Sequence, residues 1–524
     1  MGNSNHAPSR RRGRNSAKAV MIAGSHPILS LDEAKKHEAT LFHDDEAKEW
    51  PAMSRAGAAI ASAIMADWQE IGGAPANARI LVLVGKGHNG ADALIAAKKL
   101  LETHVDASVE VLFVFGERRT RPLLMRAWQE LAQQFPQRMV TIRPANLALQ
   151  YDLCIDGIFG FQFRPPVEPR VQVLIQRINS LHISLRAAVD LSSGGLFKAD
   201  FTYATGIVKS AALDGEASGR LRYLDLGFFH VEAAGVRRVL TRDVLLPLND
   251  LRPARSDKRT NGHVFVMGGS RSYPGAVLMA VEAALRSGVG LLTAFVPESL
   301  SAAFAARVPE AIWVGCPEAP EGGLALESLH LIQQRIDRAT AWLIGPGVAR
   351  EAETHALIRE VVRNSAVPLV LDADALQRDV IGIAHSPVVV TPHAGEYFRI
   401  AGDVALEDFT SGTKTTVVLK GPITRIAGQD DAPAVAGQPV IHPTYYSFFG
   451  GPVLARGGSG DILAGLIAGL LAQNPSAPLL AAARGTVWHG YAADLLARTH
   501  GQVAVTTTQL LEFLPRALRD RSRV

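Results

Sequence analysis

The chain has 524 residues, of which 48% are hydrophobic and 20% are charged, a composition typical of a globular protein rather than a disordered one. The formal net charge is +4, but removing the five positive charges that precede the first acid leaves a net charge of −1. These five residues are Arg10, Arg11, Arg12, Arg14 and Lys18. A nearly neutral body argues against nucleic-acid binding. No apolar run reaches the roughly 18 residues of a membrane-spanning helix, so we expect no membrane partner.

The basic tail and the cysteines bear on the compartment of the protein. Residues 1–25 are short of aromatic side chains and precede no recognisable nucleic-acid fold, so we interpret them as a disordered, solvated basic tail. Cys154 and Cys316 are the two cysteines, and neither has a CxxC partner. Two cysteines do not build a disulfide framework, so we expect buried thiols in a cytoplasmic protein.

The first half of the chain alternates apolar runs with helical segments. Strands are expected at 80–84, 109–115, 153–156 and 187–190, with helices at about 91–101 and 122–135. Repeated strand–helix units predict a parallel sheet with helices on both faces. Ligands of such sheets bind at the carboxyl ends of the strands. Gly85, Asp156 and Asp190 all fall at such ends, so we expect them to converge on one crevice.

The second half repeats this style from about residue 246. Expected strands at 263–267, 342–344, 369–371, 388–390 and 417–419 each run into a small or polar cluster, and a helix is expected at about 275–287. The clusters are Gly268-Gly269-Ser270, Gly345-Pro346-Gly347, Asp372-Ala373-Asp374, Thr391-Pro392-His393-Ala394-Gly395-Glu396 and Lys420-Gly421-Pro422-Ile423-Thr424. Such a row of strand ends indicates an edge that holds a polyphosphate ligand.

The stretch from Gly457 to Gly465 is the most informative in the chain. A glycine-rich turn runs into an apolar helix, and Asp461 lies at the junction. The first N–H groups of a helix lack internal partners and attract anions. A carboxylate beside a bound phosphate can take a proton, which points to phosphoryl transfer to a hydroxyl. A glycine-capped loop before a core helix is the alternative interpretation.

Taken in order, these motifs resemble the family of bifunctional NAD(P)H-hydrate repair enzymes, in which an epimerase domain precedes an ADP-dependent dehydratase domain. The resemblance covers about residues 28–515. In the first half it rests on Gly85-Lys86-Gly87-His88-Asn89-Gly90-Ala91-Asp92, Asp156-Gly157-Ile158-Phe159-Gly160-Phe161 and Val189-Asp190-Leu191-Ser192-Ser193-Gly194. We therefore expect an α/β chain of two domains, with a Rossmann-like parallel sheet over 26–245 and a ribokinase-like domain over 246–520.

The resemblance implies a role for the second half in repairing damaged cofactor. Water adds across C5=C6 of the reduced nicotinamide ring and leaves a hydroxyl at C6 in two epimers. The second half would phosphorylate this hydroxyl in the S form with ADP or ATP and Mg²⁺, release phosphate and restore the double bond. Asp461 would be the general base. Contacts to the hydrated cofactor are implied for Ala276, Gly347, His393 and Asp461, and contacts to the nucleotide for Lys420, Gly421, Pro422, Ile423, Thr424 and Gly460.

For the first half the resemblance implies interconversion of the R and S hydrates, with Asp190 as the proton carrier. Asn89, Asp156 and Ser193 match a potassium site, and hard cations prefer such oxygen ligands. Implied substrate contacts are His88, Asn89, Gly90, Ala91, Asp92, Gly160, Phe161, Gln162, Phe163, Arg164, Pro165, Pro166 and Asp190. The pattern departs from the family at His88, where Asn is typical, at Ala91 and Ala93, where glycine is typical, and at Ser192, where proline is typical.

Two other functions remain open from the sequence. The second half could be a ribokinase-like small-molecule kinase, and the first half a non-catalytic scaffold appended to it. Without the resemblance, His393 could be an ordinary satisfied polar side chain, Lys420 a surface charge, and Asp372 and Asp374 helix caps. A kinase would leave a stable phosphorylated product, whereas repair would release free phosphate and restore the absorbance of the reduced nicotinamide. Relatives of this family assemble into homo-oligomers, so we expect the same here.

Overall fold

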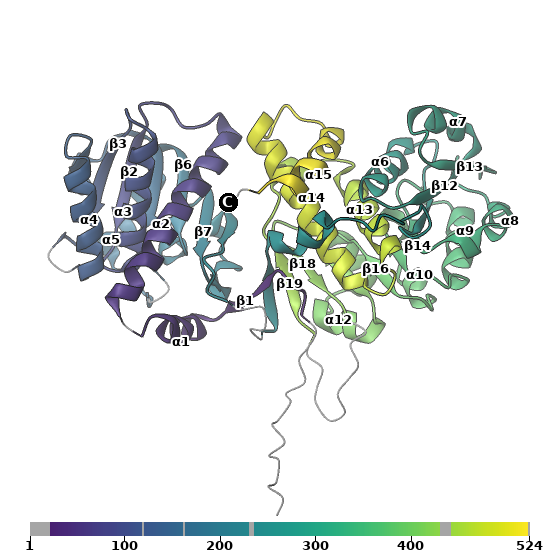
Figure 1. Ribbon diagram of the computed structural model, residues 1–524, viewed down its shortest axis with the longest axis horizontal. Coiled ribbons are helices and arrows are strands. Elements are labelled where there is room, and N and C mark those ends of the chain that lie inside the picture. Colours follow the sequence, from purple (N-terminus) through teal and green to yellow (C-terminus); the bar gives the residue numbers. More distant parts are fainter. Residues whose placement is uncertain are drawn as a thin grey trace, which may run out of the picture.

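The computed structural model describes residues 21–43, 45–117, 120–160, 163–229, 235–429 and 442–521. Within them the chain forms two α/β bodies that lie side by side, one built on a sheet of seven strands and one on a sheet of twelve (Figure 1). The expected fold class, two α/β units with parallel sheets, is confirmed. The basic run at 10–18 and two residues of the predicted substrate loop, Phe161 and Gln162, lie outside the described residues.

The first sheet has the order β4-β3-β2-β5-β6-β7-β9, with all neighbours parallel. Its strands are β2 (Arg79–Val84), β3 (Ser108–Phe113), β4 (Met139–Thr141), β5 (Gln150–Gly157), β6 (His182–Val189), β7 (Phe201–Thr205) and β9 (Arg220–Leu224). One face packs on α2 (Glu46–Trp68), α3 (His88–Thr103) and α4 (Pro122–Gln134), and the other on α5 (Pro169–Asn179). This burial on both faces explains the continuous apolar runs of β2 and β5.

The second sheet contains a parallel run in the order β13-β12-β11-β14-β15-β16-β17, followed by β18 and β19 in antiparallel pairing. Its strands are β11 (His263–Met267), β12 (Leu291–Pro297), β13 (Ile312–Cys316), β14 (Ala341–Ile344), β15 (Leu369–Leu371), β16 (Val388–Val390), β17 (Thr416–Leu419), β18 (Thr424–Ala427) and β19 (Thr444–Ser447). The strands expected from the apolar runs are therefore present.

Helices cover both faces of this second sheet. On one face lie α6 (Pro274–Arg286), α7 (Glu298–Arg307), α13 (Ser459–Gln473), α14 (Pro478–His500) and α15 (Leu510–Arg519). On the other lie α8 (Ser328–Gln333), α9 (Ala352–Arg363), α10 (Arg378–Gly382), α11 (Ala394–Ala401) and α12 (Leu406–Thr413). Helix α13 is buried all round from Ile462 to Ala472, and Gly465 lets it approach the carbonyl of Ala280 on α6. The body of α13 is therefore held firmly in the core, while its first turn is only partly buried.

Three short strands that precede residue 245 extend the second sheet. Strand β10 (Arg237–Leu240) pairs with β19, β1 (Ser25–Leu29) pairs with β10, and β8 (Val208–Lys209) pairs with β1. The helix α1 (Leu31–Phe42) follows β1 directly and lies beneath the first body (Figure 1). A domain boundary near residue 245 stays a prediction, because strands on its N-terminal side belong to both sheets.

A buried network of charges joins the two bodies. The guanidinium of Arg222 on β9 donates to Asp67 on α2 and to Asp494 on α14, each at 2.9 Å. Arg220 donates to Asp494 at 2.8 Å, and Arg498 donates to Asp67 at 2.9 Å. Because these pairs cross between the first sheet and α14, they fix how the two bodies sit against each other.

The structure also bears on two features considered in the sequence, membrane-spanning helices and the state of the two cysteines. In the part of the chain that is described, no helix is both long enough and apolar enough to cross a membrane. Cys154 and Cys316 are both free and buried, as expected.

Candidate functional site

Four of the predicted clusters of the second half lie at one edge of its sheet. Strands β14, β15, β16 and β17 are consecutive parallel neighbours, so the residues that follow them leave the sheet side by side. The amide of Lys420 donates to the carbonyl of Pro392 at 2.8 Å, and Gly345 packs against the backbone of Asp372. The expected row of strand ends therefore exists as one continuous edge.

An ion pair stands at the centre of this edge. The carboxylate of Asp372 is buried and accepts from the Thr391 hydroxyl at 2.7 Å and from the Lys420 ammonium at 3.2 Å. The first turn of α13 lies against this pair, because a Cβ on Gly460 would be 3.2 Å from Nζ of Lys420. Glycine at 460 thus lets the lysine reach the helix start.

Asp461 is the third residue of α13 and is half-buried beside the same pair. Burial, reinforced by the charge of Asp372 and opposed by Lys420, raises the pKa of Asp461 to about 7. Gly458 precedes the helix with a φ of 90°, and no side chain among the described residues caps this helix start. The first N–H groups of α13 are therefore placed to meet an anion next to a carboxyl that titrates near neutrality.

The remaining residues predicted for this half surround the edge. A Cβ on Gly347, whose φ is +70°, would lie 3.1 Å from Cβ of Ala276, so these two predicted contacts are neighbours. His393 is exposed, and its Nδ1 accepts from the amides of Gly395 at 3.1 Å and Glu396 at 3.3 Å as the cap of α11. Gly421, Pro422, Ile423 and Thr424 form the turn from β17 into β18.

Sequence reasoning missed His489, which lies on α14 behind this edge. The ring contacts the backbone of Ser459 at the start of α13, and burial, aided by the charge of Lys420, lowers the pKa of His489 to about 4. The ring is therefore neutral near pH 7. The one sequence feature that could have indicated His489 is its position as a lone histidine in the apolar run from Val487 to Tyr491.

The first half contains a cavity of about 240 Å³ at the carboxyl ends of its strands. A buried ion pair forms one end, in which Nζ of Lys209 lies 2.7 Å from Oδ1 and 2.6 Å from Oδ2 of Asp190. The hydroxyl of Thr205 lies 3.4 Å from the same carboxylate. Asp190 has a φ of +69°, an uncommon backbone conformation for a residue other than glycine, and such strain clusters at functional sites.

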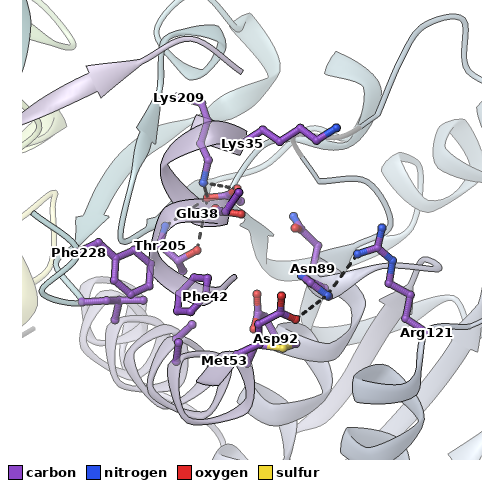
Figure 2. A pocket seen from close by; sticks show the side chains of 17 residues that line it. Lys35, Glu38, Phe42, Met53, Asn89, Asp92, Arg121, Thr205, Lys209 and Phe228 are labelled. Atoms are coloured by element: carbon purple, nitrogen blue, oxygen red, sulfur yellow. Dashed lines mark hydrogen bonds and ion pairs between the residues drawn. The ribbon is translucent and has the colours of Figure 1, made fainter. Parts of the chain in front are cut away.

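Three further carboxyl groups line this cavity: Glu49 from α2, and Asp92 from α3 and Glu38 from α1, which Figure 2 labels. Burial raises the pKa of Asp92 well above its usual value, and the charges of Asp190 and Glu38 raise it further. Within the described residues, Oδ1 of Asp92 has no hydrogen-bond partner. Burial also raises the pKa of Glu38 to about 7, against the opposing charge of Lys209. Glu38, Thr205 and Lys209 were not predicted from the sequence.

The three residues predicted as metal ligands lie together beside the cavity. Asp156 is fully buried and accepts from the Ser193 hydroxyl at 2.6 Å and from the Ser193 amide at 2.9 Å. Burial raises the pKa of Asp156 to about 6. The amide nitrogen of Asn89 donates to the carbonyls of Val189 at 2.8 Å and Phe159 at 3.2 Å, and the Phe159 amide donates to Ser193. The group is thus an oxygen-rich corner, as a monovalent cation requires.

The positions that depart from the family pattern fall into two kinds. Helix α3 begins at His88, earlier than expected, so Ala91 and Ala93 are buried helical residues without a positive φ, and alanine fits there. Ser192 donates to the carbonyl of Phe197 at 2.5 Å. The side chain of His88 lines the cavity, 3.3 Å from Arg121 and 3.6 Å from Glu49. Of the positions that differ from the family pattern, His88 is therefore the one that a ligand in the cavity would contact.

The predicted substrate residues are divided between the cavity and its surroundings. His88, Asn89, Asp92 and Asp190 line the cavity, whereas Gly90 and Ala91 lie buried behind it in α3. Of the described residues from Gly160 to Pro166, none lines it. Gly160 instead packs on the amide of Asn89, the ring of Phe163 stacks on Phe159 at 4.2 Å, and Pro165 and Pro166 continue the exposed loop.

Comparison with known proteins matches both halves of the chain. A family model described as NAD(P)H-hydrate dehydratase matches residues 264–516, and one described as YjeF-related protein N-terminus matches residues 51–211. A bifunctional NAD(P)H-hydrate repair enzyme from Gloeobacter violaceus is 36% identical, over 93% of this chain and 97% of its own. Another from Moorella thermoacetica is 33% identical, over 89% of this chain and 92% of its own.

Solved structures resemble the second half. An ADP/ATP-dependent NAD(P)H-hydrate dehydratase from Bacillus subtilis, co-crystallised with ATP and Mg²⁺, is 27% identical and covers 54% of this chain and 98% of its own, with a TM-score of 0.45. A ribokinase-like superfamily protein from Enterococcus faecalis is 28% identical and covers 55% of this chain and 98% of its own, with a TM-score of 0.46.

Proposed function

Because this chain belongs to the family of bifunctional NAD(P)H-hydrate repair enzymes, we propose that its two sites divide one repair between them. The chain is an enzyme that epimerises hydrated NAD(P)H and dehydrates it back to the reduced cofactor. The cavity beside Asp190 carries the epimerisation, and the strand edge beside Asp461 carries the dehydration. The single observation behind the second assignment is the convergence of Asp461, Lys420 and Asp372 at an uncapped helix start.

At the strand edge, a nucleotide supplies the phosphoryl group that makes the C6 oxygen a good leaving group. The helix start and Lys420 hold the charge on the transferring group, and Gly421 to Thr424 form the wall for the nucleotide. Mg²⁺, when bound with the nucleotide, would be held mainly by the phosphate oxygens and would offset part of their charge. Asp461 takes the proton from the C6 hydroxyl as its oxygen attacks phosphorus. The N1 lone pair then expels phosphate, and loss of the proton at C5 restores the C5=C6 bond.

Ala276, Gly347 and His393 are proposed to hold the hydrated cofactor at this edge. The positive φ of Gly347 and the absence of a side chain let its backbone pack against Tyr273 and Ala276, so the two predicted contacts stay side by side. His393 presents its exposed ring from the cap of α11. ADP and ATP share the diphosphate that the helix start and Lys420 would bind, so the proposal covers a nucleotide of either kind.

In the first half, Asp190 exchanges protons with the substrate during the change from R to S at C6. Its ion pair with Lys209 fixes the position of the carboxylate at one end of the small cavity. His88, Asn89 and Asp92 line the substrate cavity. Asn89, Asp156 and Ser193 would hold K⁺, whose charge would offset that of the buried Asp156 carboxylate.

One assay tests the dehydration and separates it from a kinase activity. The purified chain is incubated with hydrated NADH and either ADP or ATP, and the absorbance of reduced nicotinamide and the release of phosphate are followed together. We expect both to rise in equal amounts. A phosphorylated substrate that accumulates without recovered absorbance would instead establish a small-molecule kinase.

A further inference from the structure

One face of α1 forms a wall of the cavity in the first half. Lys35, Glu38, Ala39 and Phe42 all line it, and their spacing of three, one and three residues puts them on one side of the helix. Ala34 is the one residue of α1 that is buried. The helix therefore covers the cavity without being part of the core.

Side-chain contacts rather than burial hold α1 in place. The ring of His37 lies 3.0 Å from the carbonyl of Phe228, and the rings of Phe42 and Phe228 meet edge to face at 5.6 Å. Asp32 pairs with Arg164 of the predicted substrate loop at 3.4 Å, in an exposed position where such pairs contribute little stability. Helix α1 is therefore less firmly packed than α2 and α3, the other helices that line the cavity.

Glu38 is the charged group that this wall turns toward the sheet. It lies next to Lys209, and Figure 2 shows both at one end of the cavity, with Asp92 labelled near the opposite end. The other titratable groups that line the same cavity are Lys35, Glu49, His88, Asp92, Arg121 and Asp190. Four carboxyl groups, Glu38, Glu49, Asp92 and Asp190, thus line one cavity with the buried Lys209 ammonium, and like charges this crowded disfavour one another.

Epimerisation at C6 requires two proton transfers, because one hydroxyl leaves and another oxygen arrives on the opposite face. We propose that Glu38 is the second catalytic residue of this reaction, paired with Asp190, and that α1 carries it to the substrate. This inference rests on the epimerase function proposed above. Asp190 alone would have to serve both faces of the ring while held by Lys209.

The proposed epimerisation consists of loss of water from C6 and addition of water on the other face, each with one proton transfer. The Glu38 carboxyl gives its proton to the C6 hydroxyl, the C6–O bond breaks, water leaves, and the N1 lone pair forms the N1=C6 bond. A water on the other face then attacks C6, its proton passes to the Asp190 carboxylate, and the N1=C6 electrons return to N1. One proton moves from Asp190 back to Glu38 through water between turnovers. The pKa of Glu38, raised to about 7 by burial, suits a group that must hold and release a proton in each cycle.

The test uses the full chain with the R hydrate of NADH and no nucleotide, so that dehydration cannot proceed and only epimerisation is measured. For Glu38→Gln we expect kcat to fall by about 10²–10⁴-fold with KM changed by no more than about twofold, because the proton donor is lost and the wall remains. Glu38→Asp keeps a carboxyl group and should restore part of kcat. Glu46→Gln, an exposed carboxyl-to-amide change at the start of α2, is the matched control and should behave as wild type.

Three results would overturn the inference. Glu38→Gln could retain most of its kcat, or raise KM alone, which would make α1 a wall without a proton role. Glu38→Asp could lose as much activity as Glu38→Gln, which would make the side chain structural. If the wild-type chain itself failed to interconvert R and S hydrates, the proposed epimerase function would be wrong. Because this outcome is seen in the wild-type chain, it is distinguished from the three outcomes that concern the Glu38 variants.

Discussion

The two sites of this chain differ in what surrounds their carboxyl groups. Asp190 lies in a small cavity, paired with a buried lysine and with three further carboxyl groups in the lining. Asp461 lies at an open strand edge, beside an uncapped helix start and the pair of Lys420 with Asp372. In our proposal the cavity serves to move protons, whereas the open site serves an anion that must enter, react and leave.

The backbone contributes differently to the two sites. At the strand edge, glycines at 347, 458 and 460 let the backbone pack closely against its neighbours, so the backbone itself forms much of the site. In the cavity, side chains from α1, α2, α3, β7 and β8, together with Asp190 after β6, create the site, and they come from distant parts of the chain. A substitution at one site should therefore leave the activity of the other site unchanged. The substitutions below test this independence, from the largest expected effect to the smallest.

Asp461→Asn should remove nearly all dehydration of the S hydrate. The amide cannot accept the hydroxyl proton, and loss of a general base costs about 10²–10⁴-fold in rate, with the upper end expected here. Absorbance recovery from purified S hydrate with nucleotide measures the loss. Glu512→Gln, on an exposed position of α15, is the control. A variant that turned over at the wild-type rate would remove Asp461 from the mechanism, and a variant that also lost epimerisation would contradict the independence of the sites.

Asp190→Asn should slow conversion of R to S by about 10²–10³-fold and spare dehydration of the S hydrate. The substitution also leaves the Lys209 ammonium buried without its carboxylate, which is costly to the fold. The double change Asp190→Asn with Lys209→Met removes both charges and separates the catalytic loss from the structural one. Clearance of a racemic hydrate at the normal rate by either variant would show that Asp190 is not the proton carrier.

The strand edge could be predicted from the sequence because each of its parts is local. An apolar run followed by a small or polar cluster predicts a strand end, and parallel strands put their carboxyl ends at one edge. Gly457 to Asp461 needed only its own residues to indicate a helix start that attracts anions. The order of the strands β14 to β17 then brought these clusters together, as the apolar runs had indicated.

The cavity could be predicted only in part, because its lining depends on pairings between distant segments. Asn89, Asp156 and Asp190 follow strands and were found, whereas Glu38 reaches the site only because β1 pairs with β8 and β10 and so sets α1 beneath the sheet. No local pattern carries that information. One feature of the sequence could have indicated Lys209, a charged residue directly after the apolar pair Ile207 and Val208. Nothing in the sequence could have indicated the left-handed backbone of Asp190.

The network between the two bodies gives a third prediction, on stability rather than chemistry. Arg222→Met would leave the buried carboxylates of Asp67 and Asp494 without their shared partner, and breaking a buried pair in this way costs about 3 kcal/mol or more. Denaturant unfolding measures the loss. Arg350→Met breaks an exposed pair with Asp374 and should change stability by less than about 1 kcal/mol. Equal effects of the two changes would mean that the network adds no more than a surface pair does.

The smallest expected effect is a shift in the pH dependence of dehydration, and it tests the electrostatics of the open site. The pKa of Asp461 is raised to about 7 by burial and by the charge of Asp372, while Lys420 lowers it. A general base works only when deprotonated, so the rate should fall as the pH drops through about 7. Asp372→Asn removes a negative charge, lowers the pKa of Asp461 and should move this fall to lower pH.

Lys420→Met removes a positive charge and should move the fall in the opposite direction, to higher pH. Each shift is expected to be on the order of one pH unit, the usual spread of carboxyl pKa values among proteins. Dehydration of the S hydrate at saturating nucleotide, measured from pH 5 to 9, gives both profiles, and epimerisation of the R hydrate without nucleotide gives the control. The electrostatic explanation is wrong if both variants shift the dehydration profile in the same direction. It is also wrong if the epimerisation profile shifts together with the dehydration profile, because Asp372 and Lys420 belong to the strand edge alone.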